Sequence, residues 1–278
     1  MTLLPEAQAA TLADASGIDP NLVPVEVLDS APAPKKKLGL GAWLSCGWLG
    51  LLLFTSVFAD ILPIKDPNVQ STDTPLLAPF SGGLLLGADS NGRDMLSRLI
   101  YGTRTSLEIG FAAVAVGFII GGVLCLFAGY YRNWIGRVLA SFFDILLAIP
   151  ALVLVLSLVS VLKGDPTADS SLPGEVILII AIGIVSIPLL ARITRANTLA
   201  WSQREFVLAA KAQGAGSGRI LFREILPNVL PAMGYIALLG VGLAIVAEGA
   251  AALFGASVNP PGATLGRSEE HTSELQSR

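Results

Sequence analysis

The sequence predicts an all-α, polytopic membrane protein. Of its 278 residues, 53% are hydrophobic and only 14% are charged, whereas about a quarter of the residues in a soluble domain are charged. The mean hydropathy is +0.69. The apolar residues also fall in long runs, and a bilayer core requires about 20 such residues for each helical span. Strands of a membrane barrel would show short alternating segments instead, so we expect helices.

Five apolar runs are long enough to cross a bilayer. We expect the spans at roughly residues 40–62, 106–128, 138–162, 175–197 and 229–253. Pro150 and Pro188 lie inside two of these runs. Each is expected to bend its helix, because proline has no backbone N–H to donate and its ring clashes with the preceding turn.

The first 38 residues differ from the rest of the chain. They are rich in Ala, Pro and Asp, show no sustained apolar period and end in lysines at 35–37. We expect residues 1–38 to be a disordered cytoplasmic tail. The alternative is a signal peptide, because a basic triplet precedes an apolar run, but the basic cluster comes late and four more spans follow.

Lysine and arginine predict the orientation. With a cytoplasmic N-terminus, the inside segments contain 11 of these residues and the outside segments contain five. Basic residues concentrate in short cytoplasmic loops, so we expect the N-terminus and the segment 203–227 on the inside.

The sequence lacks the residue types that most catalytic sites need. Cys46 and Cys125 fall within predicted spans, where a small buried side chain is expected rather than a disulfide or metal ligand. The single histidine is His271, near the C-terminus, and the chain has no Walker-type phosphate loop. We therefore expect no catalytic residue, metal site or cofactor, and any nucleotide site must come from another chain.

A charged, glycine-containing segment separates the last two apolar runs. It reads EFVLAAKAQGAGSGRILFREILPNVLP over residues 205–231. The glycines at 214–218 are expected to end a first helix, and Pro227 to interrupt a second. An ordinary basic connector against anionic lipid is the alternative. At helical spacing, one side of the first helix carries Phe206 as a large apolar anchor with Ala209, Ala210 and Gln213.

This segment resembles the cytoplasmic EAA loop of membrane subunits of binding-protein-dependent ABC importers, most closely the peptide and nickel uptake branch. The match consists of paired alanines, a glycine after three intervening residues, and Ile-Leu-Pro-Asn at 225–228. Leu208 stands where the family often has glutamate. The resemblance implies a coupling helix that docks in a groove of an ATPase. It assigns to this ATPase-coupling loop Glu205, Phe206, Ala209, Ala210, Gly214, Ile225, Leu226 and Pro227.

A second resemblance to the same branch covers GADSNGRDMLSRLIYGTRTSLEIG at 87–110. Turn formation and helix capping are one explanation for its polar residues. The other is an outer-face element that contacts the binding protein or gates the pathway. The residues of this outer-face motif are Asp89, Gly92, Arg93, Asp94, Ser97 and Arg98.

Two acidic residues lie within predicted spans, where a charge is costly. Asp144 begins DILLAIPALVLVL, which is also similar to the peptide branch, and we expect it to pair with Arg137 or Arg195 at the cytoplasmic rim rather than to line a pathway. Glu248 lies deeper, followed by small residues. It is predicted either to face a pathway or its gate, or to lie in close helix packing.

The resemblance extends over about residues 38–266 and implies a type I importer permease fold with a permease domain at 39–266. The family usually has six spans, so we expect five of six and a chain truncated at its C-terminus. The last residues, RSEEHTSELQSR at 267–278, resemble the translation of a sequencing-library adapter. We expect them to be an artefact; the alternative is an authentic hydrophilic terminus.

The function that the resemblance implies is translocation without bond chemistry. The chain is expected to be a permease subunit of an ATP-driven ABC importer in the bacterial inner membrane, carrying peptides or a similar small solute. The implied partners are a second homologous permease, two ATPase subunits and an extracytoplasmic binding protein, with the lipid bilayer around them and no nucleic acid. An ion-coupled secondary transporter would show inverted repeats and buried acids. A membrane enzyme would need a nucleophile, base or metal.

Overall fold

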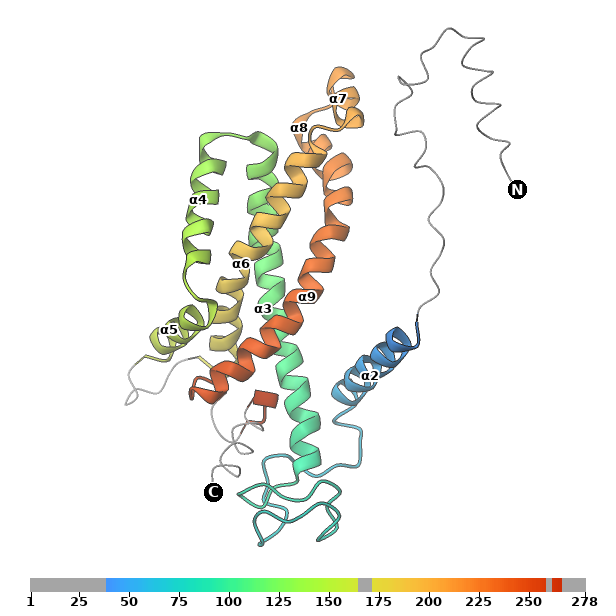
Figure 1. The fold of residues 1–278 in the computed structure, drawn as a ribbon, viewed down its shortest axis with the longest axis vertical. Helices are drawn as coiled ribbons and strands as arrows, with labels where there is room; N and C mark the ends of the chain where they lie inside the picture. The colour runs from blue at the N-terminus through green and yellow to red at the C-terminus, as the bar shows by residue number, and fades with distance from the viewer. Residues whose placement is uncertain (1–38, 165–171, 259–261, 267–278) are drawn as a thin grey trace, which may run out of the picture. The chain divides into compact units, whose positions relative to one another are not determined.

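The regular elements of the described residues are helices (Figure 1). The computed structural model describes residues 39–164, 172–258 and 262–266. The chain divides into two units, residues 1–48 and 49–278. The predicted tail at 1–38 and the predicted adapter segment at 267–278 lie outside the described residues.

Among the described residues the helices follow one another with short connections, apart from the long segment 58–94 between the first two helices. In chain order they are α2 (Leu40–Val57), α3 (Met95–Tyr131), α4 (Trp134–Ala148), α5 (Ala151–Lys163), α6 (Gly174–Trp201), α7 (Glu205–Ala212), α8 (Ser217–Arg219), the π-helix η3 (Ile220–Ile225) and α9 (Leu226–Leu253).

Four helical stretches of the described residues are long and apolar enough to cross a membrane: α2, α3, α6 and the continuous stretch Ser217–Leu253. The predicted third span is not one straight helix, because α4 and α5 meet at an angle of 94°. The break lies at Pro150, which cannot donate to the preceding turn. If the bent pair counts as one span, the described residues contain five. Pro188, in contrast, lies inside α6, which continues to Trp201.

Glycines allow α3 and α6 to pack with their backbones close together. A Cβ atom added at Gly117 would lie 2.9 Å from Cβ of Ser186, and one added at Gly121 would lie 2.6 Å from the carbonyl oxygen of Ile187. No larger residue fits either position without displacing α6. Close approach through small residues spaced four apart is a common way for helices to associate in lipid, where the hydrophobic effect does not drive them together.

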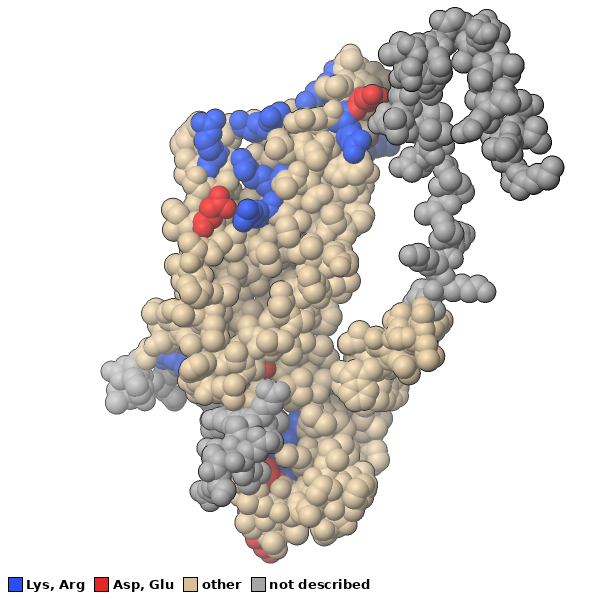
Figure 2. Space-filling view, in the orientation of Figure 1, with Lys and Arg blue, Asp and Glu red and all other residues tan. Residues whose placement is uncertain are grey.

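The α9 helix packs against the α3–α6 pair and completes the main core. Val241 and Ala244 of α9 lie in one buried cluster with Ile109 and Val114 of α3 and Ile182 of α6. The opposite side of α9 exposes large apolar residues, including Leu238 and Val246. Lysine and arginine side chains gather at the end of the molecule that carries α7 and α8 (Figure 2). An apolar outer surface with charges at its ends is what a bilayer requires.

The glycine contact predicts a selective effect of adding one methyl group. Gly121→Ala should destabilise the protein by about 1–3 kcal/mol, because the added Cβ overpacks the helix interface. Gly242→Ala on α9 is the matched control, since no atom lies within 4 Å of its added Cβ. Thermal unfolding in detergent should show a lower Tm for Gly121→Ala alone; equal Tm values for the two variants would contradict the packing argument.

Candidate functional site

The predicted coupling loop forms α7, a turn and α8 at the basic end of the molecule (Figure 1, Figure 2). Val207 of α7 is fully buried, whereas Phe206, the predicted large apolar residue of the partner-facing side, is not. The Phe206 ring is 38% exposed and lies 6.1 Å from the ring of Trp201. Val207 packs into a second buried cluster with Ile220 and Val229 and so anchors α7 to the helices beneath it. The helical spacing of the loop alone does not reveal this contact.

The predicted break after α7 is confirmed. Gly214 has φ of +81°, a left-handed conformation that glycine adopts without steric cost. The other predicted coupling residues differ in accessibility. Glu205, Phe206, Ala209, Gly214 and Pro227 are exposed, Ala210 and Leu226 are half-buried, and Ile225 is buried.

The prediction that Pro227 interrupts a second helix is wrong. The chain forms one continuous helical path from Ser217 to Leu253, and its six-residue π-helix ends directly before the α9 turn that contains Pro227. Proline cannot complete the i→i−4 hydrogen bond and crowds the preceding turn. The wider π turn accommodates this local mismatch without ending the helix.

At the opposite end of α3, the outer-face motif folds the 58–94 segment onto the helix. Asp89 Oδ1 accepts hydrogen bonds from the backbone N–H groups of Asn91 and Arg93, both at 2.8 Å. Asp89 Oδ2 lies 3.4 Å from Nε of Arg98, and both side chains are only 3% exposed. Arg98 Nη1 also donates to the carbonyl oxygen of Pro67 at 3.3 Å. The motif is therefore a buried polar network that organises this segment.

The remaining motif residues complete the same network. Asp94 caps α3 by accepting from the N–H of Leu96 at 3.2 Å. Ser97 Oγ donates to the carbonyl oxygen of Lys65. Gly92 has φ of +70°, and a Cβ there would lie 2.3 Å from the carbonyl oxygen of Thr72. Arg93 contributes through its backbone, which forms an antiparallel bridge with Gln70.

A second, exposed ion pair lies near this end of α3. Arg104 Nη1 lies 2.7 Å from Oδ2 of Asp60 and Arg104 Nε lies 3.0 Å from Oε1 of Glu108. The hydrogen bond from Arg104 holds the pKa of the Asp60 carboxyl below its usual value. Because these side chains are exposed, solvent and salt screen the interaction.

Glu248 lies in close helix packing, which is one of its two predicted environments. It is fully buried and accepts a hydrogen bond from Ser106 Oγ at 3.0 Å. Ser257 Oγ lies 3.4 Å from its other oxygen. Ser106 in turn accepts from the N–H of Leu265 at 3.1 Å, so this carboxylate joins α3, α9 and the segment 262–266. Ser106 is 142 residues away from Glu248 in the chain, so no local sequence pattern indicates this contact.

Asp144 does not form the predicted ion pair. Among the described residues it has no salt bridge to Arg137 or Arg195 within 4.0 Å. It lines a cavity together with Arg192 and Arg195. Asp144 on α4 and the two arginines on α6 therefore face the same cavity without contacting one another. In the described ranges, no three His, Cys, Asp or Glu side chains form a group able to hold a metal ion.

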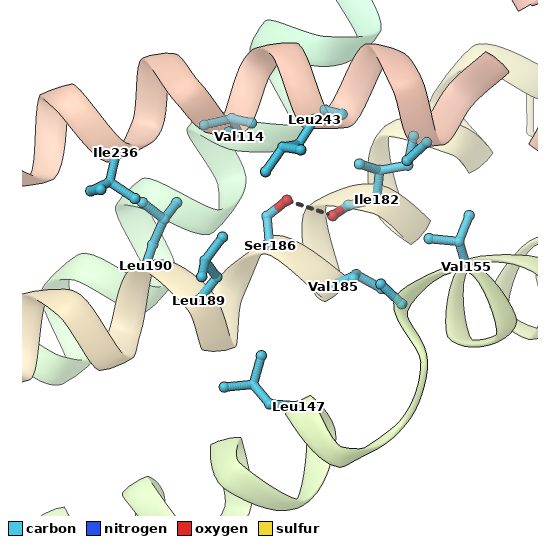
Figure 3. Close-up of a pocket in the computed structure, with 14 residues that line it drawn as sticks. Val114, Leu147, Val155, Ile182, Val185, Ser186, Leu189, Leu190, Ile236 and Leu243 are labelled. Atoms are coloured by element: carbon cyan, nitrogen blue, oxygen red, sulfur yellow. Dashed lines mark hydrogen bonds between the residues drawn. The ribbon is translucent and has the colours of Figure 1, made fainter. Parts of the chain in front are cut away.

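An apolar cavity lies between α3, the α4–α5 bend, α6 and α9 (Figure 3). Its volume is about 200 Å³. Leucine, isoleucine and valine side chains dominate its wall, and Ser186 is its one hydroxyl-bearing residue. The Ser186 hydroxyl donates to the carbonyl oxygen of Ile182 at 2.8 Å, within its own helix (Figure 3). The cavity thus presents no charged group to a solute, and no motif in the sequence indicates its position.

Residues 117–268 match the family described as "Binding-protein-dependent transport system inner membrane component". The chain is 37% identical over 218 residues to a dipeptide transport system permease protein of Alkalihalophilus pseudofirmus, covering 77% of this chain and 68% of the relative. The chain belongs to this family. It is also 36% identical over 259 residues to a di/tripeptide transport system permease protein of Pseudomonas aeruginosa, covering 89% and 80%. A glutathione transport system permease protein of Pectobacterium atrosepticum is 35% identical over 220 residues, covering 78% and 70%.

The permease is thus a membrane subunit of an ABC importer, and the predicted family, its peptide branch and the type I permease fold are confirmed. Its location is the inner membrane, which it crosses several times. A permease of such a system works with an ATPase and a binding protein and is not itself an enzyme.

The buried Asp89–Arg98 pair should contribute more to stability than the exposed Asp60–Arg104 pair. Asp89→Ala removes the carboxylate that faces Arg98 and should destabilise the 58–94 segment by about 3–5 kcal/mol, the usual cost of breaking a buried pair. Asp60→Ala, which removes an exposed partner of Arg104, is the control and should have little effect. Hydrogen exchange of this segment should accelerate for Asp89→Ala only. Similar exchange in both variants would show that burial does not strengthen the Asp89–Arg98 pair.

Proposed function

We propose that the permease forms half of a translocation pathway with a second, homologous permease, and that two separate ATPase subunits hydrolyse ATP to drive it. The observation that carries this proposal is the connection of an exposed, small-residue helix to the buried core. Ala209 of α7 is exposed, while its neighbour Val207 packs with Ile220, Ile225 and Val229. A force on α7 therefore acts on the first turns of α9.

This connection supports an ATPase-coupling role for Glu205, Phe206, Ala209, Ala210, Gly214, Ile225, Leu226 and Pro227. Small exposed side chains on α7 let a partner approach its backbone closely. Gly214 permits the sharp turn behind α7, and Leu126 links the same buried cluster to α3. Differential contacts of the ATPases with α7 in two states would bias the helices between inward and outward access.

The solute that we propose is a short peptide, delivered by an extracytoplasmic binding protein. Relatives that are 35–37% identical to this chain over the aligned residues are dipeptide, di/tripeptide and glutathione permeases. The apolar cavity has a single hydroxyl group, which is bonded within its own helix. This lining supports a pathway that does not select the solute, so that selection is left to the binding protein. The proposed contact for that protein is the rim of the outer-face motif, where Asn91 is exposed and Arg93 is half-buried.

The coupling role predicts sensitivity to bulk at one exposed position. Ala209→Trp should abolish most ATP-dependent peptide uptake, because the indole would hold the ATPase away from α7, whereas Ala209→Ser keeps the small size and should retain it. The measurement is uptake into vesicles that contain the permease with its partner permease, ATPases and binding protein. Uptake should not respond to an uncoupler. Uptake that needs an ion gradient and not ATP, or equal activity of both variants, would contradict the proposal.

We further propose that the N-terminus and the coupling loop are cytoplasmic. In a variant whose two native cysteines are replaced, a membrane-impermeant thiol reagent should label Thr74→Cys in intact cells. The same reagent should label Ser217→Cys only after permeabilisation. Both positions are exposed, but Thr74 lies in the segment before α3 and Ser217 lies at the opposite end of the helices, beside α7. Labelling of Ser217→Cys in intact cells would reverse the orientation.

A further inference from the structure

A second cavity, of about 330 Å³, lies between α3, α4 and α6 on the side of the coupling loop. Ligand pockets in proteins typically have volumes of roughly 300–1,000 Å³. This cavity combines charged and apolar walls, unlike the apolar one described above. The residues that define it are Arg192, Arg195 and Leu199 of α6, Phe143 and Asp144 of α4, and Cys125 of α3.

The two arginines lie one helical turn apart on α6 and line the same space. Neither forms a salt bridge within 4.0 Å of a described carboxylate, and Asp144 on the opposite wall does not reach them. With two guanidinium groups and one carboxylate, the cavity carries a net charge of +1. A pocket of this kind offers guanidinium donors to one singly charged anion.

Its position along the helices is close to a membrane surface. α6 ends at Trp201. With a helical rise of about 1.5 Å per residue, Arg195 lies about 9 Å and Arg192 about 14 Å before this end. On α4, Val138, Phe142 and Ile145 are exposed apolar residues. Trp134 is exposed at the first position of α4, and tryptophan typically lies at the membrane interface.

Figure 2 shows basic and acidic side chains next to each other near this end of α4 and α6. Long arginine side chains extend from an apolar segment toward the headgroups. The mouth of the cavity therefore lies where a lipid headgroup and its acyl chains meet, with the apolar face of α4 beside it.

We propose that this cavity binds the phosphate group of an anionic phospholipid, such as phosphatidylglycerol, in the leaflet on the coupling-loop side. Arg192 and Arg195 bind the phosphate, since guanidinium forks form strong charge-assisted bonds with phosphate oxygens. Phe143 and Leu199 contact the glycerol and the first acyl carbons. The assignment of the leaflet rests on the proposed orientation of the permease.

Asp144 makes the site selective for a singly charged phosphodiester. The net charge of +1 balances the one charge of a phosphatidylglycerol headgroup. Free inorganic phosphate carries roughly one and a half negative charges at neutral pH and has no acyl chains to contact the apolar wall. Asp144 thus sets the net charge of the cavity, whereas the sequence predicts that it forms an ion pair at the cytoplasmic rim.

The test is binding of short-chain phosphatidylglycerol to the permease, purified with its partner subunits in a neutral detergent, measured by native mass spectrometry as the fraction of lipid-bound complex. Phosphatidylcholine of the same chain length and inorganic phosphate are the comparison ligands. The double variant Arg192→Gln/Arg195→Gln should bind phosphatidylglycerol at least about tenfold more weakly, because it loses two charge-assisted contacts. Arg132→Asn is the matched control: it removes a basic residue at the same end but outside the cavity, and asparagine tolerates the φ of +50° at this position.

The result expected is a large loss in the double variant and a change of less than about twofold in Arg132→Asn, which contributes only general surface charge. Equal losses in both, or equal binding of phosphatidylcholine, would overturn the proposal. Inorganic phosphate that competes at the same concentration would show an adventitious anion site and would also overturn it. Competition by a transported dipeptide would assign the cavity to the solute instead.

A further variant keeps the test decisive if the double variant does not fold. Asp144→Asn retains both arginines and raises the charge of the cavity to +2, so it should bind phosphatidylglycerol more tightly than the unmodified protein and accept inorganic phosphate more readily. Unchanged binding of both ligands would contradict the role of Asp144. ATP-dependent uptake by the unmodified complex, measured separately, distinguishes the two proposals. If the unmodified complex transports peptide but does not bind phosphatidylglycerol, only the lipid site is refuted. If it binds phosphatidylglycerol but does not transport peptide, only the transport function is refuted.

Discussion

The close approach of α3 to α6 is the contact on which the rest of this structure depends. Gly117 and Gly121 bring the two backbones together, and the side chains around them form the core that α9 joins. In a bilayer, apolar side chains gain little by leaving lipid for protein, so association depends on packing at short range. Both cavities lie beside this pair, and residues of α3, α4 and α6 line each of them.

The coupling loop and the outer-face motif are anchored differently, although both stand at helix ends. Hydrophobic burial holds the loop through Val207 and the π-helix and so connects it to the helices beneath it. A polar network around Asp89 and Arg98 holds the outer segment. Such networks depend on direction and distance, which makes this segment a fixed platform. One end of the permease is thus suited to transmit motion and the other to present a defined surface.

The sequence was sufficient to predict the helical fold, the number of apolar segments and the family, because these depend on composition and on motifs that are contiguous in the chain. It predicted the break at Pro150, whose cause is local, but not its 94° angle. It did not single out Val207, because the burial of this residue depends on which side of α7 meets η3. The environments of Asp144 and Glu248 depend on residues from other helices, such as Arg192 and Ser106, and periodicity along one segment contains no such information.

The length of α3 also determines where a soluble partner meets this permease. Its 37 residues extend about 55 Å, whereas the hydrocarbon core is about 30 Å thick. An upright α3 that ends near the inner boundary would raise its first turn, and the Asp89 network around it, about 25 Å above the outer boundary of the core. The Debye length in physiological salt is about 8 Å, so the charge of the lipid headgroups is largely screened at that height. In the orientation proposed above, a protein that binds there would respond mainly to the charges of the permease itself, so its capture should depend little on the lipid composition of the outer leaflet.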